Sequence, residues 1–133
     1  MTFFWDKNLA KTIPQAIRML KPPFGTEIYL EHFPLSDQYR EGGDDVWLPF
    51  VGSNGWFVIT QDYNLHVHLN ELRATQQYNI GVFYLWGATA PKWDVMRLFV
   101  RSSDRIIQRA LTTPRPFIYR VYKSGSLYPV AIH

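Results

Sequence analysis

The sequence contains no cysteine among its 133 residues. A disulfide framework and a thiolate zinc site are therefore both excluded. The absence of cysteine is compatible with a reducing compartment, so we expect the protein to work in the cytoplasm.

Long apolar runs are also missing, because none reaches the ~18 residues that a membrane-spanning helix needs. The N-terminus lacks the basic start and the long apolar core of a signal peptide. We therefore expect no membrane partner. The sequence also lacks a Gly-rich phosphate loop, a G-x-S-x-G elbow and a Ser/His/Asp set with recognisable spacing.

Hydrophobic residues, in contrast, make up 47% of the chain and aromatic residues 17%, which excludes a disordered protein. The length is close to the most common size of one domain. We expect a single domain over residues 1–133, with an α/β core over residues 1–113 and a terminal hairpin over residues 114–133.

The net charge of +3 is unevenly spread along the chain. Residues 1–89 hold six Lys or Arg against nine Asp or Glu, a net charge of −3. Residues 90–133 hold eight Lys or Arg against two Asp, a net charge of +6. An acidic part beside a basic part indicates a cation site next to a polyanionic partner.

Two apolar runs in the sequence each end in an aspartate. Residues 3–5 are followed by Asp6, and residues 56–61 are followed by Asp62. Such runs are typical of buried parallel strands, whose C-terminal edge is where open α/β sheets bind ligands. Two carboxylates at one edge repel each other unless a cation lies between them. The alternative is that each Asp only terminates its strand in a turn.

Strand-like and helix-like segments alternate along the chain. The strand-like segments cover residues 3–5, 26–33, 56–61, 81–86, 117–123 and 127–132, and the helical patterns lie within residues 9–20, 44–51, 63–77 and 92–111. Alternation of this kind predicts a three-layer α/β/α sandwich, in which helices cover both faces of a mostly parallel sheet. The last two segments predict a β-hairpin at the C-terminus.

A third carboxylate, Asp44, opens the short helix that precedes the second Asp-terminated strand. Its simplest explanation is an N-cap, although a capping carboxylate keeps a second oxygen for other ligands. Together with Asp6 and Asp62 it would form an all-oxygen site, which suits Mg²⁺ or Mn²⁺.

The last helical pattern carries a row of arginines spaced four apart. Spacing of four places them on one face of the helix, and the guanidinium group is well shaped for phosphate. We expect this arginine row to bind RNA, whereas the alternatives are a solvated face, an acidic protein partner or a second copy of the chain, which would make a homodimer. The row consists of Arg97, Arg101, Arg105 and Arg109.

Three segments together resemble the PIN-like domain family, and more closely a compact branch related to VapC-type toxin ribonucleases. They are the segments 3–9 (FFWDKNL), 44–48 (DDVWL) and 55–62 (GWFVITQD). The resemblance covers about the first 90 residues. It implies a PIN fold and a metal-dependent endoribonuclease, the toxin of a toxin–antitoxin pair, with Mg²⁺ or Mn²⁺ as cofactor and a cognate antitoxin as a protein partner.

The resemblance also implies roles for individual residues. Asp6, Asp44 and Asp62 match the family's catalytic, metal-binding acids. Supporting roles fall to Thr60, as a hydroxyl beside the second run, and to Asn8, at the position after the first acid. The family's four-acid pattern is incompletely filled, and the candidates for its fourth acid are Asp45 and Glu31.

The sequence therefore predicts hydrolysis of RNA phosphodiester bonds by a Mg²⁺- or Mn²⁺-dependent ribonuclease. The main alternative is a catalytically inactive PIN-like module that binds RNA or protein. A phosphoacceptor domain of receiver type also gathers acids at strand ends, but the helix at Asp44 and the T-x-D run at Thr60 fit it less well.

Overall fold

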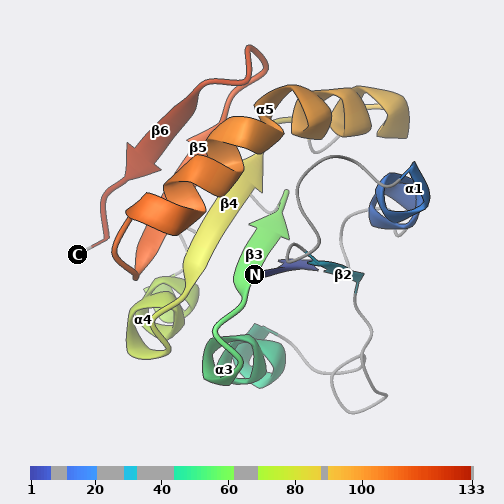
Figure 1. The fold of residues 1–133 in the computed structure, drawn as a ribbon. Helices are drawn as coiled ribbons and strands as arrows, with labels where there is room; N and C mark the ends of the chain where they lie inside the picture. Colours follow the sequence, from blue (N-terminus) through green and yellow to red (C-terminus); the bar gives the residue numbers. More distant parts are fainter. Residues whose placement is uncertain (7–11, 21–28, 33–43, 62–68, 88–89, 133) are drawn as a thin grey trace.

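The computed structural model describes residues 1–6, 12–20, 29–32, 44–61, 69–87 and 90–132. Its strands are β1 (Thr2–Trp5), β2 (Tyr29–His32), β3 (Phe57–Thr60), β4 (Gly81–Leu85), β5 (Phe117–Val121) and β6 (Leu127–Val130). Its helices are α1 (Thr12–Leu20), α3 (Asp44–Ser53), α4 (Leu69–Gln77) and α5 (Lys92–Thr112). Each of the predicted strand and helix segments therefore overlaps an element of the expected type (Figure 1).

The strands form one sheet in the order β2-β1-β3-β4-β5-β6. Strands β1 to β5 pair parallel with one another, and β6 pairs antiparallel with β5. The predicted C-terminal hairpin is thus confirmed. Its first strand is also the fifth parallel strand of the main sheet, because β5 pairs with β4 along its whole length.

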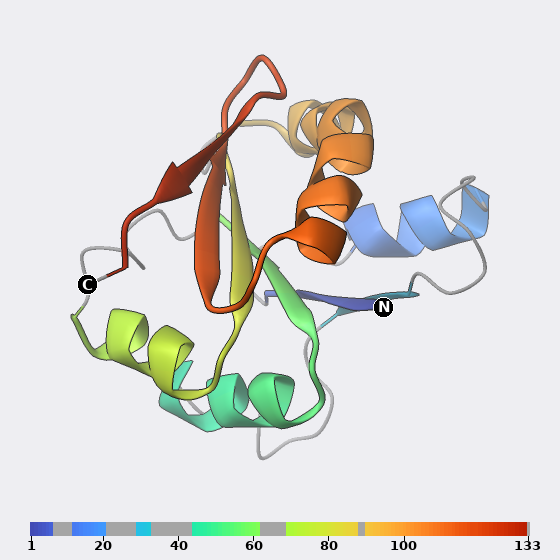
Figure 2. The same ribbon diagram turned by 60° about the vertical axis from the view of Figure 1, so that its left-hand side comes forward.

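Helices cover both faces of the sheet, which confirms the predicted three-layer α/β/α architecture. Alternate residues of a strand point to opposite faces, so Phe3 and Trp5 pack with α1 and α5, whereas Phe4 packs with α3. Figure 2 shows α1 and α5 on one side of the sheet and α3 and α4 on the other. Burial on both faces explains why the central strands are apolar at successive positions.

Helix α5 lies on the face of the sheet opposite to the one that a right-handed crossover would give. The connections from β3 to β4 and from β4 to β5 step across the sheet in the same direction. Helix α4 of the first connection packs on one face and α5 of the second packs on the other. The two crossovers therefore have opposite hands, although such crossovers are nearly always right-handed. This arrangement places α5 against the same face as α1.

Prolines lie at the starts of two of the helices. Helix α1 begins at Thr12, so Pro14 falls in its first turn, where a missing backbone N–H costs no helical hydrogen bond. Helix α5 begins directly after Pro91, which occupies its N-cap position. None of the helices that the structure describes combines the length and the apolar character needed to cross a bilayer.

A cluster of aromatic rings fills the core beneath α5, and Gly81 makes room for it. Gly81 pairs in register with Phe57 on one side and Phe117 on the other. The two rings stack over the glycine with centroids 6.0 Å apart. A methyl group at Gly81 would lie 2.8 Å from Cδ1 of Phe57 and 2.7 Å from Cε1 of Phe117.

We predict that Gly81→Ala lowers the free energy of unfolding by about 1–3 kcal/mol, because overpacking a filled core forces neighbouring rings to shift. Urea denaturation followed by fluorescence measures the change. Gln76→Ala on the exposed face of α4 is the control and should alter stability by less than about 0.5 kcal/mol. Equal stability of the two variants would contradict this account of the core.

Candidate active site

Asp6 lies directly after β1, at the carboxyl edge of the sheet. Its backbone N–H donates to the carbonyl oxygen of Ile59 at 3.0 Å, so the pairing with β3 continues one residue past the strand. Only 3% of the residue is exposed. A carboxylate this deeply buried loses most of its hydration, and such groups persist only where hydrogen bonds or cations compensate.

Thr60 is the last residue of β3 and supplies one such compensating interaction. Its Oγ1 hydroxyl donates to Oδ2 of Asp6 at 2.9 Å, and the residue is 2% exposed. A hydrogen bond from a neutral hydroxyl to a carboxylate is charge-assisted and hence stronger than a neutral one. The structure therefore brings together two of the residues predicted for the site and fixes one oxygen of Asp6.

The strand order gives this pair its location. In the sheet, β2 lies beside one edge of β1, and the next strand in the chain, β3, lies beside the other edge of β1. The helices of these two connections, α1 and α3, lie on opposite faces of the sheet. Open α/β sheets bind ligands in the crevice that opens at such a switch point, outside the carboxyl ends of the strands. Asp6 and Thr60 lie at the carboxyl ends of β1 and β3, the two neighbouring strands at this switch point.

The other predicted acids are placed only in part. Helix α3 begins at Asp44, as predicted, and Asp45 follows in its first turn. Glu31 lies in β2, in register with Phe4. The side chains of these three acids are outside what the structure describes, and Asp62 and Asn8 lie outside the described residues altogether.

The described part of the site fits a hard divalent cation in its chemistry. The described residues contain no group of three or more His, Asp and Glu side chains that could hold a metal ion. Asp6 and Thr60 nevertheless contribute only oxygen atoms, and Mg²⁺ and Mn²⁺ prefer oxygen ligands. A buried carboxylate at the carboxyl edge of the sheet is therefore a suitable first ligand.

The arginine row lies on α5, and all four of its side chains are exposed. No ion pair with a carboxylate of the described residues is found for Arg97, Arg101, Arg105 or Arg109. Two of them instead donate to the hairpin that joins β5 to β6. Nη1 of Arg101 lies 3.3 Å from the carbonyl oxygen of Lys123, and Nη1 of Arg105 lies 3.0 Å from that of Gly125.

Sequence reasoning did not single out four residues that extend the site along the sheet edge, namely Gln61, Gly87, Trp86 and Lys123. Nε2 of Gln61 donates to the carbonyl oxygen of Gly87 at 3.1 Å, which links the ends of β3 and β4. Trp86 follows β4 and is 45% exposed, with Nζ of Lys123 5.3 Å from its ring centroid. The available signal was position, because Gln61 and Trp86 each directly follow a strand.

Comparison with known families gives one match. A family model described as a PIN like domain matches residues 1–87, which include β1 to β4 and the Asp6–Thr60 pair. No curated protein and no solved structure matches the chain. The match supports the PIN-like resemblance seen in the sequence, whereas the closer relationship to VapC-type toxins stays a prediction.

We predict that Thr60→Val keeps the fold but weakens metal binding about 10- to 100-fold, the usual effect of removing a residue that orients a metal ligand. Valine has nearly the same shape as threonine but cannot donate a hydrogen bond to Asp6. The measurement is the shift of the melting temperature on titration with Mn²⁺, which reports binding to the folded state. Thr60→Ser, which keeps the hydroxyl, should restore most of the affinity. Equal Mn²⁺ affinity of wild type and Thr60→Val would contradict the role of Thr60.

Proposed function

Because the chain belongs to the PIN-like domain family, we propose that it is a metal-dependent ribonuclease that hydrolyses RNA phosphodiester bonds. The observation that carries the proposal is the buried carboxylate of Asp6, held by Thr60 at the switch point of the sheet. Carboxylates are rarely buried at the end of a strand whose only role is structural. A buried acid at this edge is typical of a ligand-binding position.

The proposed ligands of the metal are Asp6, Asp44 and Asp62, with Asp45 or Glu31 as candidates for a fourth acid. Bound Mg²⁺ or Mn²⁺ would acidify a water molecule and neutralise charge that develops on the phosphate. Because Thr60 already fixes the orientation of the Asp6 carboxylate, Asp6 would lose less side-chain freedom when it binds the metal. Asn8 remains a supporting residue of this proposal.

The biological setting that we propose is a toxin–antitoxin pair, which rests on the resemblance of the first 90 residues to VapC-type toxins. The second candidate function is an RNA- or protein-binding module without cleavage. It is favoured by the exposed arginines of α5, which lie outside the segment that matches the family. Metal-dependent cleavage separates the two candidates, because only the first requires the acids.

We predict that Asp6→Asn reduces Mg²⁺-dependent cleavage of a mixed RNA pool at least about 100-fold, since even residues that only orient a ligand cost 10- to 100-fold. The variant should fold normally, because asparagine has nearly the same shape and removes a buried charge. Gel analysis of the RNA with Mg²⁺, Mn²⁺ or EDTA measures cleavage, and circular dichroism checks the fold.

Asp104→Asn is the matched control, because it makes the same chemical change on an exposed residue of α5. Cleavage by this variant at saturating RNA should equal that of the wild type. Cleavage that persists in EDTA, or that Asp6→Asn leaves at the wild-type rate, would overturn the assigned site.

A further inference from the structure

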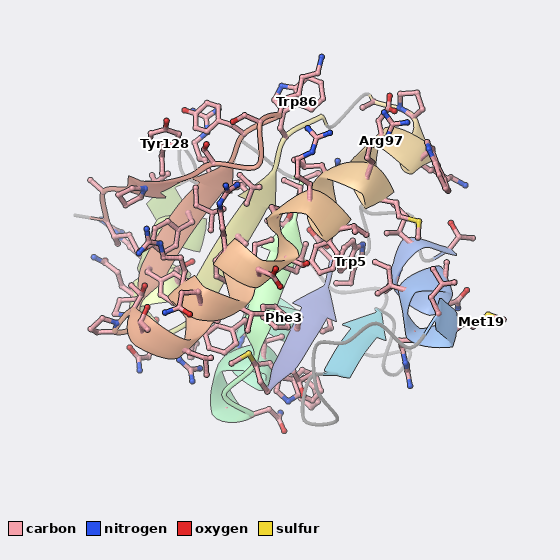
Figure 3. All side chains as sticks on the ribbon, turned by 45° about the horizontal axis from the view of Figure 1, so that its top comes forward. Phe3, Trp5, Met19, Trp86, Arg97 and Tyr128 are labelled. Carbon is pink, nitrogen blue, oxygen red and sulfur yellow. The ribbon has the colours of Figure 1, made fainter. Side chains whose placement is uncertain are left out.

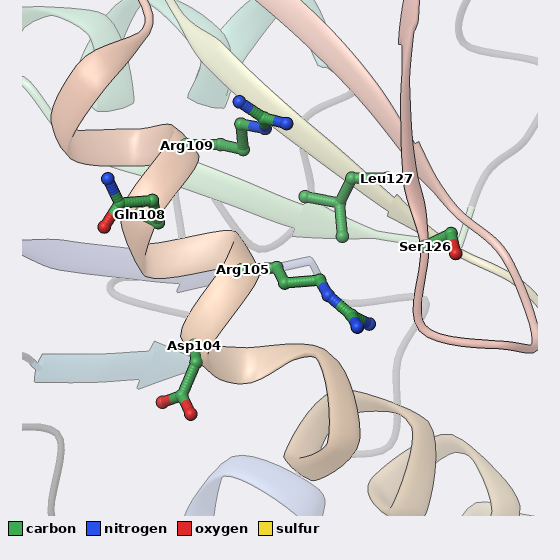
Figure 4. A pocket seen from close by; sticks show the side chains of 6 residues that line it. All are labelled: Asp104, Arg105, Gln108, Arg109, Ser126 and Leu127. Atoms are coloured by element: carbon green, nitrogen blue, oxygen red, sulfur yellow. The ribbon is translucent and has the colours of Figure 1, made fainter.

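The contacts of α5 divide the arginine row into two kinds of residue. Arg101 and Arg105 donate to carbonyl oxygens of the hairpin, whereas no interaction with other described residues is found for Arg97. Figure 4 shows Arg105 pointing toward the hairpin and Asp104 pointing away from it. Arg101 and Arg105 thus hold the hairpin against α5, whereas Arg97 has no such contact within the described part of the chain.

The hairpin turn is shaped for this contact. Gly125 has a φ of +89°, a left-handed conformation that favours glycine. A Cβ atom at this position would lie 3.1 Å from Nη1 of Arg105 and 3.3 Å from Cγ of Arg101. The turn therefore packs closely between the two arginines, and the groove between α5 and the hairpin has a defined wall.

Exposed aromatic rings accompany the basic groups at this end of the molecule. Trp86, Tyr122 and Tyr128 are 45%, 39% and 55% exposed. Tyr122 and Tyr128 meet edge to face at 4.9 Å, and Arg120 lies 5.3 Å from the ring centroid of Tyr122. Large rings left exposed next to cations are a usual feature of surfaces that bind unpaired nucleic acid.

A cavity of about 250 Å³ lies where Trp86 meets the arginine row. Its lining combines one aromatic ring, three cations, one carboxylate and one apolar residue, namely Trp86, Arg97, Arg101, Lys123, Asp94 and Leu98. Three cations against one carboxylate make the cavity attractive to a phosphate.

The cavity lies at the same edge of the sheet as the candidate active site. Thr60 donates a hydrogen bond to Asp6. Gln61, the residue after Thr60, donates a hydrogen bond to Gly87, which is adjacent to Trp86 in the sequence. Figure 3 shows Trp86 and Arg97 at the end of the molecule toward which β1 points. A polynucleotide that occupies the cavity could therefore continue along the sheet edge to the acids.

We propose that this cavity binds an unpaired nucleotide of single-stranded RNA, an inference that rests on the proposed ribonuclease function and names its substrate class. Trp86 stacks on the base, and Arg97 and Lys123 bind the adjoining phosphates. Arg101 and Arg105 act as positioning residues, since they hold the hairpin that carries Lys123. Duplex RNA does not fit this role, because its bases are stacked on each other and cannot reach the indole ring.

A second cavity of about 460 Å³ lies further along the same groove, lined by Asp104, Arg105, Gln108, Arg109, Ser126 and Leu127 (Figure 4). It has no aromatic ring among these lining residues. Arg109 lies 5.8 Å from the ring centroid of Tyr119, which is itself buried. Base stacking is therefore assigned to the cavity beside Trp86 and not to this one.

The test is binding of a fluorescently labelled single-stranded decamer of uridine, measured by anisotropy in EDTA so that no cleavage occurs. Trp86→Ala should weaken binding roughly 5- to 100-fold, the range expected for loss of one base–aromatic stack. Trp86→Phe should recover much of the affinity, because phenylalanine keeps a stacking face. Because nearly half of Trp86 is exposed, both variants should melt within a few degrees of the wild type.

Arg97→Ala tests the phosphate contact through the salt dependence of binding. Loss of one phosphate contact to a single strand should reduce the slope of log K against log salt by about 0.7. Arg105→Ala removes an arginine of the same row that is bonded to the hairpin. It should lower the melting temperature more than Arg97→Ala does and change the salt slope less.

The outcomes separate this inference from the proposed function. If Trp86→Ala and Arg97→Ala bind the decamer as the wild type does, the inference is overturned, even where Mg²⁺-dependent cleavage is intact. If both variants lose binding but the wild type never cuts RNA, the inference stands and the ribonuclease proposal fails. The inference is also overturned if the protein binds a blunt RNA duplex as tightly as the decamer and Trp86→Ala leaves duplex binding unchanged. The same holds if the variants bind RNA normally and lose only the binding of an acidic protein partner.

Discussion

The hydrogen bond from Thr60 to Asp6 is the constraint on which the candidate site depends. It joins the ends of two strands that are 54 residues apart in the sequence. The bond is possible only because Trp5 pairs in register with Ile59, which sets Asp6 opposite Thr60. Register in turn is fixed by burial on both faces, since a slip of one residue would exchange the two sets of core side chains.

The same burial explains why most of the fold could be predicted from the sequence. Strands covered by helices on both faces must be apolar at successive positions, so β1, β3 and β4 are visible as short apolar runs. Asp6 was visible because it marks the point where the first apolar run stops, whereas Thr60 was singled out through the resemblance to the PIN-like family. The hand of the last crossover was not visible, since no local pattern states on which face α5 packs.

The arginine row shows where periodicity stops being informative. A spacing of four predicts that the side chains share a helical face, and on that basis Arg97 and Arg105 look equivalent. They differ because Gly125 brings the hairpin turn against Arg105, a contact between segments 20 residues apart. Trp86 was overlooked for a related reason, since its exposure depends on the strand ending there and not on its neighbours in the sequence.

The acidic and the basic parts of the sequence correspond to different parts of the structure. The segment that matches the family ends at residue 87 and carries Asp6 and the other acids of the chain's acidic part. The basic part begins beyond it and consists of α5 and the β5–β6 hairpin, which form the groove beside Trp86. Repulsion between an RNA backbone and the carboxylates has to be offset near the site, and fixed cations on the adjoining wall would provide this without neutralising the acids themselves. An acidic edge for the proposed metal and a basic groove for the proposed RNA strand would therefore work best as neighbours in one sheet, the arrangement in which Gln61 and Gly87 connect them.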